Sequence, residues 1–157
     1  MQSQEIPSQG GTYALLLDRM QVKQMSVGKL GTYALPRGTF CYVGSAHGPG
    51  GLAGRIKRHM RPSSEKRLHW HIDWLLEQAN LQQVWWVESP HLLECTWSQT
   101  IAHLAESPIP GFGSSDCSCV SHLYTMRNVQ HQREVFRELR KCQTEDVCCA
   151  SSDQSLP

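Results

Sequence analysis

Short apolar runs and helical periodicities follow one another along the chain and predict its elements. Apolar, β-compatible runs bounded by glycine or proline predict strands at 11–17, 39–46 and 83–88. Apolar residues three or four positions apart predict four helices, at 51–61, at 69–79, between Pro90 and Pro108, and at 129–142. Elements in this irregular order are typical of the α+β class, so we expect an α+β fold with a small mixed sheet.

Residues typical of turns, and the polar composition of both chain ends, predict the loops and the tails. Gly28, Gly31 and Pro36 predict turns, with a short extra strand, between the first two strands. A loop rich in glycine and serine at 111–119 and a candidate strand at 122–126 precede the last helix, as a C-terminal addition. We therefore predict a flexible tail at 1–10, one domain at 11–142 and a disordered tail at 143–157.

The composition excludes a protein that spans a membrane through helices. The longest apolar runs are far below the roughly 20 residues that a spanning helix needs. The first ten residues lack the basic start and apolar stretch of an export signal, which indicates a cytoplasmic protein. The seven cysteines then indicate thiols or metal ligands rather than a disulfide framework, and their odd number agrees.

Basic residues are concentrated in one part of the chain. All 15 lysines and arginines lie within 11–142, whereas four of the 14 acidic residues lie outside it, so this part carries a net charge of +5. The densest basic stretch is 55–71, which suits a polyanion, although a solvated helix face has the same composition. The candidate nucleic-acid contacts are Lys57, Arg58, Arg61, Lys66, Arg67, His69 and His71.

Some of these side chains and their aromatic neighbours have a second interpretation. His69 and His71 bracket Trp70 at a helix start, where an imidazole usually packs or caps, and His69 is placed to hydrogen-bond Asp73 one turn later. Trp85 and Trp86 must face opposite sides of a strand. Either one of them stacks on a base, or both lie in buried layers.

A second group of residues has the chemistry of a metal site. Cys117, Cys119 and His122 form a C-x-C-x2-H pattern, which supplies three candidate ligands within six residues. Cys95 would complete a tetrahedral structural zinc site. The alternative is a set of thiols in a turn that binds no metal.

Four short motifs occur in order along the chain. They are Gly11-Thr12-Tyr13, Tyr42-Val43-Gly44, Arg55 with His59 on the following helix, and Glu94 on the third helix. With the longer strings YVGSAHGPGGLAGRIKRH, HWHIDWLL and GFGSSDCSC, they make the chain resemble the GIY-YIG nuclease family, and in particular its Uri-type branch. Together the matches span nearly all of 11–124.

This resemblance implies a fold, an activity and a role for each residue. The fold would be a small three-stranded mixed sheet flanked by helices, and the activity would be metal-dependent endonucleolytic cleavage of DNA. Tyr13 would be the general base or orient the water, Tyr42 would be its partner, and Arg55 would be the transition-state clamp. His59 would contact phosphate or transfer a proton, and Glu94 would bind Mg²⁺ or Mn²⁺. A tyrosine base needs a lowered pKa, for which Arg55 and a metal-bound water would be the causes.

The chain departs from the family pattern in two ways. The gap between Tyr13 and Tyr42 is longer than in compact members, and Tyr33, in a second GTYAL string, lies closer to Tyr42. We favour Tyr13 because the apolar run after it suits a central strand, whereas Pro36 suits an edge or a turn. No asparagine after Glu94 convincingly matches the last motif of other branches.

The residue types by themselves support the same chemistry. Phosphodiester hydrolysis needs a water nucleophile, a proton acceptor, positive charge near phosphorus and help for the leaving oxygen. Arg55 and His59, four apart on a helix, can meet one phosphate, and Glu94 near a helix start can hold a hard cation. The alternative is a nucleic-acid-binding module that does not cut and carries zinc on its cysteine cluster. A nuclease requires the five catalytic candidates to converge on one cleft.

Overall fold

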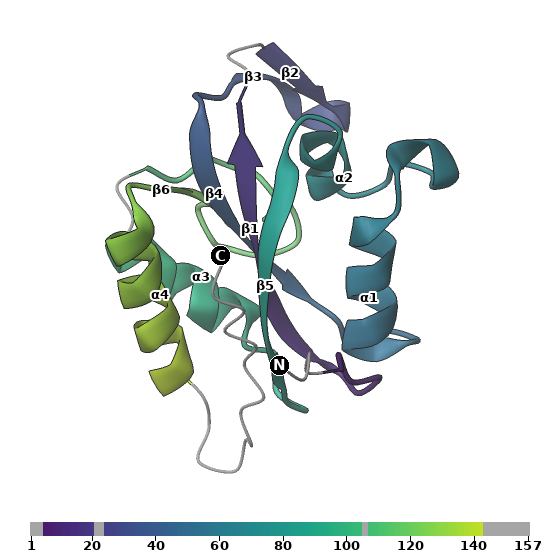
Figure 1. Ribbon diagram of the computed structural model, residues 1–157, viewed down its shortest axis with the longest axis vertical. Helices are drawn as coiled ribbons and strands as arrows, with labels where there is room; N and C mark the ends of the chain where they lie inside the picture. Colours follow the sequence, from purple (N-terminus) through teal and green to yellow (C-terminus); the bar gives the residue numbers. More distant parts are fainter. Residues whose placement is uncertain (1–4, 21–23, 105–106, 143–157) are drawn as a thin grey trace.

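A four-stranded antiparallel sheet forms the centre of the molecule. The computed structural model describes residues 5–20, 24–104 and 107–142. The strand order is β5-β1-β4-β6, with β1 at Gly11–Arg19, β4 at Gly38–Ser45, β5 at Asn80–Glu88 and β6 at Leu123–Met126. Between β1 and β4 the chain forms a separate hairpin of β2 (Gln24–Val27) and β3 (Gly31–Ala34), which stands at one end of the sheet (Figure 1).

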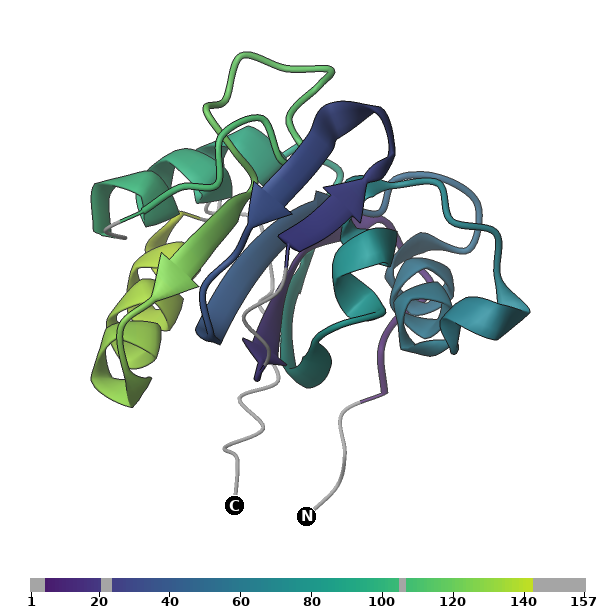
Figure 2. The ribbon, with the colours of Figure 1, turned by 90° about the horizontal axis from the view of Figure 1, so that it is seen from above.

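Helices cover both faces of this sheet. They are α1 (Gly51–Met60), α2 (His71–Leu76), α3 (Glu94–Leu104) and α4 (Val129–Lys141). α1 and α2 lie against one face and α3 and α4 against the other, as two perpendicular views agree (Figures 1 and 2). None of the helices in the described part of the chain has the length and apolar character needed to cross a membrane. The α+β class predicted from the sequence is confirmed.

The sheet differs from the prediction in size and in strand direction. β6 pairs with β4 as a fourth strand, so the sheet is not three-stranded, and every pairing is antiparallel, so it is not mixed. The crossover through α1 and α2 does return β5 parallel to β4. Because β1 lies between these two strands and pairs with both, no parallel neighbours are formed.

Alternate residues of the central strand enter two different cores. Tyr13, Leu15 and Leu17 pack under α1 and α2, whereas Ala14 and Leu16 pack under α3 and α4. This separation follows from the two-residue period of a strand, with the whole of β1 shielded by a helical layer on each side. The same residues that form the first core therefore lie next to α1, which carries the basic motif.

The two adjacent tryptophans of β5 both belong to buried layers. Trp86 enters the core under α1 and α2, and Trp85 enters the core under α3 and α4, each only 3% exposed. Neither ring is accessible to a base. The interpretation of one of them as a stacking platform is therefore wrong, because the sheet is covered on both faces.

The helix α2 is shorter than its apolar periodicity predicts. The backbone N–H groups of His69 and Trp70 donate to the Asp73 carboxylate at 2.8 and 3.0 Å. These bonds hold the chain extended up to Trp70, so the helix begins only at His71. The predicted contact between His69 and Asp73 exists, but the backbone makes it and the imidazole does not.

Residues 7–10 are part of the fold rather than of a flexible tail. The carbonyls of Pro7 and Gln9 accept hydrogen bonds from the N–H groups of Ala53 and Leu52, at 2.8 and 2.9 Å. They thus satisfy backbone donors at the start of α1 that the helix itself leaves without partners. Ile6 also packs against the core under α1 and α2, so the predicted tail is wrong for residues 6–10. Residues 1–4 and the predicted disordered tail at 143–157 lie outside the described residues.

Candidate active site and metal centre

A cleft of about 390 Å³ opens beside the central strands. It is bounded by β1 and β4, by α1, by the segment that enters α2, by the start of α3 and by the loop that follows α3. Four of the five predicted catalytic residues line it, namely Tyr13, Tyr42, Arg55 and Glu94. The full set of lining residues is Tyr13, Tyr42, Ser45, Arg55, His69, Trp70, His71, Glu94, Gly113, Ser115 and Asp116.

The glycines of the first two motifs make room for this arrangement. Gly44 of β4 lies opposite Tyr13 of β1 in the antiparallel register. A Cβ at Gly44 would lie 2.3 Å from the Tyr13 hydroxyl oxygen, and a Cβ at Gly11 would lie 2.1 Å from the Val87 carbonyl oxygen. Because both distances are far below contact distance, any larger residue at Gly44 would displace the Tyr13 ring.

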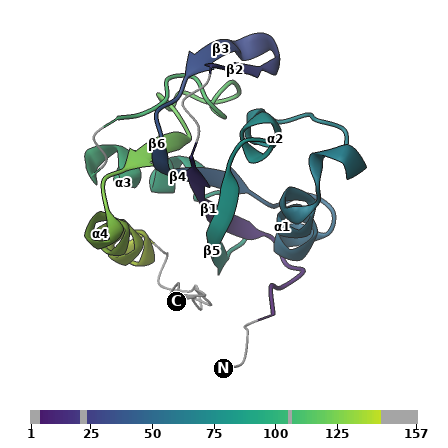
Figure 3. The ribbon, with the colours of Figure 1, turned by 45° about the horizontal axis from the view of Figure 1, so that its top comes forward.

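Tyr33, the competing tyrosine of the second GTYAL string, lies outside the cleft. It belongs to β3, and its hydroxyl donates to the Pro110 carbonyl at 3.1 Å. The β2–β3 hairpin thereby packs on the loop between α3 and β6 (Figure 3). The preference for Tyr13 agrees with this geometry, since Tyr13 is the tyrosine of the central strand that lines the cleft.

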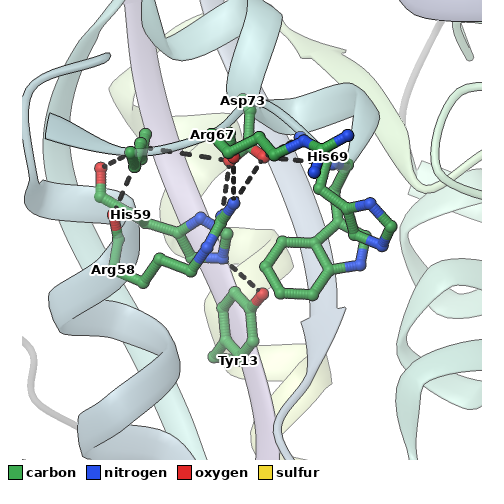
Figure 4. Close-up of polar contacts among 8 residues, drawn as sticks. Tyr13, Arg58, His59, Arg67, His69 and Asp73 are labelled. Atoms are coloured by element: carbon green, nitrogen blue, oxygen red, sulfur yellow. Dashed lines mark hydrogen bonds and ion pairs between the residues drawn. The ribbon is translucent and has the colours of Figure 1, made fainter. Parts of the chain in front are cut away.

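Tyr13 and His59 form a buried pair. The Tyr13 hydroxyl lies 2.7 Å from Nε2 of His59, and the two side chains are 1% and 3% exposed (Figure 4). His59 projects from α1 toward the Tyr13 hydroxyl and does not line the cleft itself. A contact between His59 and phosphate is therefore not supported, whereas proton transfer with Tyr13 is geometrically direct.

The two tyrosine hydroxyls of the cleft remain protonated at neutral pH. Burial raises the pKa of Tyr13 well above its ordinary value, and the neighbouring Tyr42 raises it further. Arg55 lowers this pKa, as expected from the sequence, but burial outweighs it. Burial also raises the pKa of Tyr42, with Glu94 acting in the same direction. Of the two causes predicted to lower the pKa of Tyr13, Arg55 acts in the predicted direction but does not suffice by itself.

Burial acts on His59 in the opposite sense, because it disfavours the charged imidazolium. It lowers the pKa of His59 to about 3, although the Asp73 carboxylate nearby raises it. His59 is therefore neutral at physiological pH and has one nitrogen that accepts a hydrogen bond.

Trp70 holds two guanidinium groups at the entrance of the cleft. The Cζ atoms of Arg55 and Arg58 lie 4.1 and 4.2 Å from the centre of the Trp70 ring system. Stacking on an aromatic face fixes the orientation of a planar guanidinium. Trp70 is thus a site residue to which the sequence analysis gave no role, and its position between two histidines in a basic stretch was the available signal.

Two of the predicted nucleic-acid contacts are engaged inside the protein. Arg58 donates to both Asp73 oxygens, at 2.8 and 3.0 Å (Figure 4). Lys66 donates to the carbonyls of Arg58 and His59. The Lys66 side chain is only 3% exposed. These cations join the end of α1 to the start of α2. Their first role is structural, because the buried Asp73 requires compensation.

The remaining basic residues of this stretch lie at the surface. Lys57, Arg61 and Arg67 are exposed. A groove of about 720 Å³ beside the cleft is lined by Arg58, Arg61, Glu65, Lys66, Arg67, Leu68, His69 and Trp70. Because His69 and Trp70 line both cavities, the basic groove leads into the cleft.

His71 connects the cleft to the loop after α3. Its Nδ1 accepts a hydrogen bond from the Gly113 N–H at 2.8 Å, so the hydrogen of the neutral ring is on Nε2. Burial lowers the pKa of His71 and favours this neutral form. The ring therefore positions the loop and presents a donor rather than a charge.

The predicted cysteine and histidine ligands come together next to Glu94 of the cleft. The ligand atoms of Cys95, Cys117, Cys119 and His122 all lie within 4.8 Å of one another, and this cluster could hold a metal ion. Cys95 is in the first turn of α3, the two other cysteines are in the following loop, and His122 immediately precedes β6. The β4 residue Val43 donates its N–H to the His122 carbonyl at 2.9 Å and anchors the cluster to the sheet.

Burial disfavours the ionisation of two thiols of this cluster. Burial raises the pKa of Cys119 to about 12, and the neighbouring thiols of Cys95 and Cys117 contribute. Burial also raises the pKa of Cys95. Thiols packed this closely become thiolates when a cation compensates their charge.

One comparison with known proteins gives a match. The model of a family described as a domain of unknown function, DUF123, matches residues 12–144. No curated protein and no solved structure matches the chain. The matched stretch contains every residue that lines the cleft and all four residues of the cysteine and histidine cluster.

Proposed function

The chain belongs to the DUF123 family of domains of unknown function, and from the geometry of its cleft we propose that it is a metal-dependent endonuclease acting on DNA. The observation that carries this proposal is the convergence of Tyr13, Tyr42, Arg55 and Glu94 on one cleft that continues into a basic groove. A binding module needs the basic groove but has no use for a carboxylate beside two tyrosines. The resemblance to the Uri-type branch of GIY-YIG nucleases supports the same activity.

The cleft fits a hard divalent cation. Glu94 is 28% exposed in its side chain and lines the cleft with Asp116, so carboxylate oxygens are available there. Mg²⁺ and Mn²⁺ are commonly held by one or two carboxylates together with waters and substrate phosphates. A cation bound at Glu94 would neutralise charge on the phosphate and on the leaving oxygen.

Arg55 is the group that we propose to bind the scissile phosphate. Its guanidinium lines the cleft while one face rests on Trp70, so its orientation is set before the substrate arrives. A fixed fork of N–H donors stabilises the charge that develops on phosphate oxygens in the transition state. His71, which keeps its ring hydrogen on Nε2, is placed to add a further donor from the same cleft.

Tyr13 and His59 would accept the proton of the attacking water together. Since the Tyr13 hydroxyl is protonated, it can take a proton from water only if it passes its own proton to Nε2 of His59. The neutral His59 offers an unprotonated Nε2 in the tautomer that carries its hydrogen on Nδ1, although burial disfavours the imidazolium that this transfer would form. The O–H bond of water breaks as the Tyr13 O–H bond forms, and the original phenolic proton moves to the imidazole. Tyr42 lines the cleft with Tyr13 and has no part in this proton transfer.

For the cluster of Cys95, Cys117, Cys119 and His122 we propose Zn²⁺ as the ion. Three thiolates and one imidazole are a ligand set that structural zinc prefers, whereas Mg²⁺ and Mn²⁺ prefer oxygen ligands. The four ligands leave no open position for a substrate. The protein would therefore carry a structural zinc ion beside a cleft that binds a different, harder cation.

The experiment is cleavage of labelled single-stranded, duplex, nicked and branched DNA in the presence of Mg²⁺ or Mn²⁺. We expect cleavage by the natural chain and none by Glu94→Gln, which keeps the shape of the side chain but loses its charge. Glu77→Gln is the control, since Glu77 is an exposed carboxylate outside the cleft and its removal should leave cleavage unchanged.

Binding without cleavage on every DNA and with either metal would contradict the nuclease. The basic groove and the zinc cluster would then support a nucleic-acid-binding module that does not cut.

A further inference from the structure

We infer that the metal ion of the cysteine and histidine cluster positions the Glu94 carboxylate in the cleft through the imidazole of His122. Occupancy of the cluster would then control the affinity of the cleft for its own divalent cation. The inference rests on the proposed function only in giving Glu94 a cation to bind. It concerns two metal ions in one molecule. The ion of the cluster would hold Glu94, which is a ligand of the ion in the cleft.

The cluster already has nearly the dimensions of a tetrahedral site. With zinc–sulfur bonds of about 2.3 Å and zinc–nitrogen bonds of about 2.0 Å, tetrahedral ligand atoms lie about 3.5 to 3.8 Å apart. Nε2 of His122 lies 3.4 Å from Sγ of Cys117, and all four ligand atoms are within 4.8 Å of one another. Small side-chain movements would therefore close the site.

The ring of His122 is oriented so that its two nitrogens face different partners. Nε2 lies at the thiols, whereas Nδ1 lies 3.3 Å from Oε1 of Glu94. Nδ1 is buried and has no well-aligned hydrogen-bond acceptor among the described residues. An ion on Nε2 places the ring hydrogen on Nδ1, from which it is donated toward Glu94. Metal-bound histidines usually donate their other N–H to a carboxylate or a carbonyl in this way.

The same ion would thus restrain both the backbone and the carboxylate of Glu94. Its backbone neighbour Cys95 is a ligand, and its carboxylate faces the imidazole of another ligand. One oxygen would be held by His122 while the other remains available in the cleft that Glu94 lines. Without the ion, His122 can adopt either tautomer, and the tautomer that leaves Nδ1 bare cannot donate to Glu94.

The competing interpretation is a redox cluster of three thiols. A disulfide between two of these cysteines would not involve His122 and would leave no reason for its Nδ1 to face Glu94. The coordinated arrangement accounts for all four residues and for the carboxylate contact. We therefore argue for the metal.

The first measurement is the zinc content of the purified full-length chain and its variants. We expect one zinc ion per chain in the natural protein and in Cys142→Ser, because Cys142 is a cysteine outside the cluster. Cys117→Ser should lose the ion. Replacement of zinc by Co²⁺ should give the absorption of a tetrahedral thiolate site. A chain that binds neither Zn²⁺ nor Co²⁺ with its thiols reduced would overturn the inference.

The second measurement separates a positioning role of His122 from a merely structural one. His122→Cys keeps four zinc ligands but removes the nitrogen that faces Glu94. We expect it to retain zinc and to bind Mn²⁺ in the cleft about tenfold more weakly, measured by electron paramagnetic resonance. Retained zinc with unchanged Mn²⁺ affinity would overturn the coupling, and so would Mn²⁺ binding by the natural chain that Glu94→Gln leaves intact.

The natural chain provides the same test without a substitution. Removing zinc with a chelator should weaken Mn²⁺ binding, and restoring zinc should recover it; unchanged Mn²⁺ affinity would overturn the inference. Mn²⁺ binding that depends on zinc in a protein that cleaves no DNA would support the inference while contradicting the nuclease. The two proposals can therefore fail separately.

Discussion

Tyr13 lies at the boundary between the hydrophobic core and the cleft. Its ring is part of the core under α1 and α2, and its hydroxyl meets His59 at 2.7 Å. The burial that raises the pKa of Tyr13 also lowers that of His59, so at neutral pH both groups are uncharged. One residue pair would thus serve both stability and the proposed proton transfer, which makes a conservative substitution the informative test.

Removing only the hydroxyl of Tyr13 should abolish most of the proposed activity with little effect on folding. For Tyr13→Phe we expect the rate of DNA cleavage to fall by about 10² to 10⁴, because a general base contributes about this factor. The free energy of unfolding should fall by about 1 to 2 kcal/mol, since His59 loses its buried partner. Single-turnover cleavage and urea unfolding measure the two effects.

Tyr33→Phe is the matched control for this substitution. It removes a hydroxyl that donates to the Pro110 carbonyl outside the cleft, so the cleavage rate should stay that of the natural chain. A Tyr13→Phe protein that cuts as fast as the control would remove Tyr13 from the mechanism.

At the scale of elements, a single buried carboxylate joins α1 to α2. Asp73 accepts hydrogen bonds from Arg58 near the end of α1 and from the backbone of His69 and Trp70 before α2. Burial opposes the ionisation of Asp73, but these donors outweigh it and hold the pKa of the carboxyl below its ordinary value. These contacts of Asp73 also place Trp70 at the cleft, and Arg55 stacks on Trp70 there.

From these contacts of Asp73 we predict that the protein loses stability in acid. Because the pKa of Asp73 is lower in the folded protein than in the unfolded chain, its contribution is complete above the ordinary pKa near 4. It is lost as the pH falls through the lower, folded value. For Asp73→Asn we expect a loss of about 2 to 3 kcal/mol in the free energy of unfolding at pH 7, and a smaller difference from the natural chain near pH 3.

Urea unfolding of both proteins across this pH range is the measurement. The control is Glu138→Gln, which removes the surface ion pair with Lys141 and should cost less than about 1 kcal/mol. A difference between Asp73→Asn and the natural chain that does not shrink in acid would mean that the charge of Asp73 contributes nothing to stability.

At the scale of the whole molecule, basic residues occupy both sides of the sheet but only one side meets the cleft. Arg61 and Arg67 line the groove that leads into the cleft, beside α1. Arg133 and Arg137 are exposed on α4, which covers the opposite face of the sheet (Figure 1). If DNA follows the groove to the cleft, only the first pair contacts its phosphates.

This asymmetry predicts which arginines contribute to the salt dependence of DNA binding. The double variant Arg61→Gln and Arg67→Gln should weaken binding and reduce the slope of log affinity against log salt by about 1 for each phosphate that the protein no longer neutralises. The double variant Arg133→Gln and Arg137→Gln carries the same change in net charge and should leave the slope unchanged. Fluorescence anisotropy at several salt concentrations compares them, and equal effects of the two variants would contradict the proposed path.

Much of the fold follows from local patterns that can be read directly. Apart from the shorter α2, the predicted strands and helices begin and end close to the predicted positions, because apolar periodicity, glycine and proline act over a few residues. The motif residues Tyr13, Tyr42, Arg55 and Glu94 came instead from the resemblance to the GIY-YIG nucleases, whose short motifs each lie within one element. The set of Cys95, Cys117, Cys119 and His122 was identifiable from ligand type and spacing.

Other features depended on contacts between residues far apart in the chain. β1 separates β4 from β5, and so makes the sheet antiparallel, only once all three strands have paired. Asp73 accepts hydrogen bonds from Arg58, 15 positions away, so a cation predicted to bind nucleic acid is paired with a carboxylate of the protein itself. Lys66 is withdrawn from the surface in the same way.

The sequence by itself thus determined which segments become helices and strands and which side chains are chemically equipped for a site. Only the tertiary structure decided which of them meet, which are buried, and what their ionisation is. The pairing of Tyr13 with His59 across 46 positions and the contact of His122 with Glu94 are both decided in this way. The physical reason is that propensity acts locally, whereas desolvation and hydrogen bonding depend on the complete surroundings of a group.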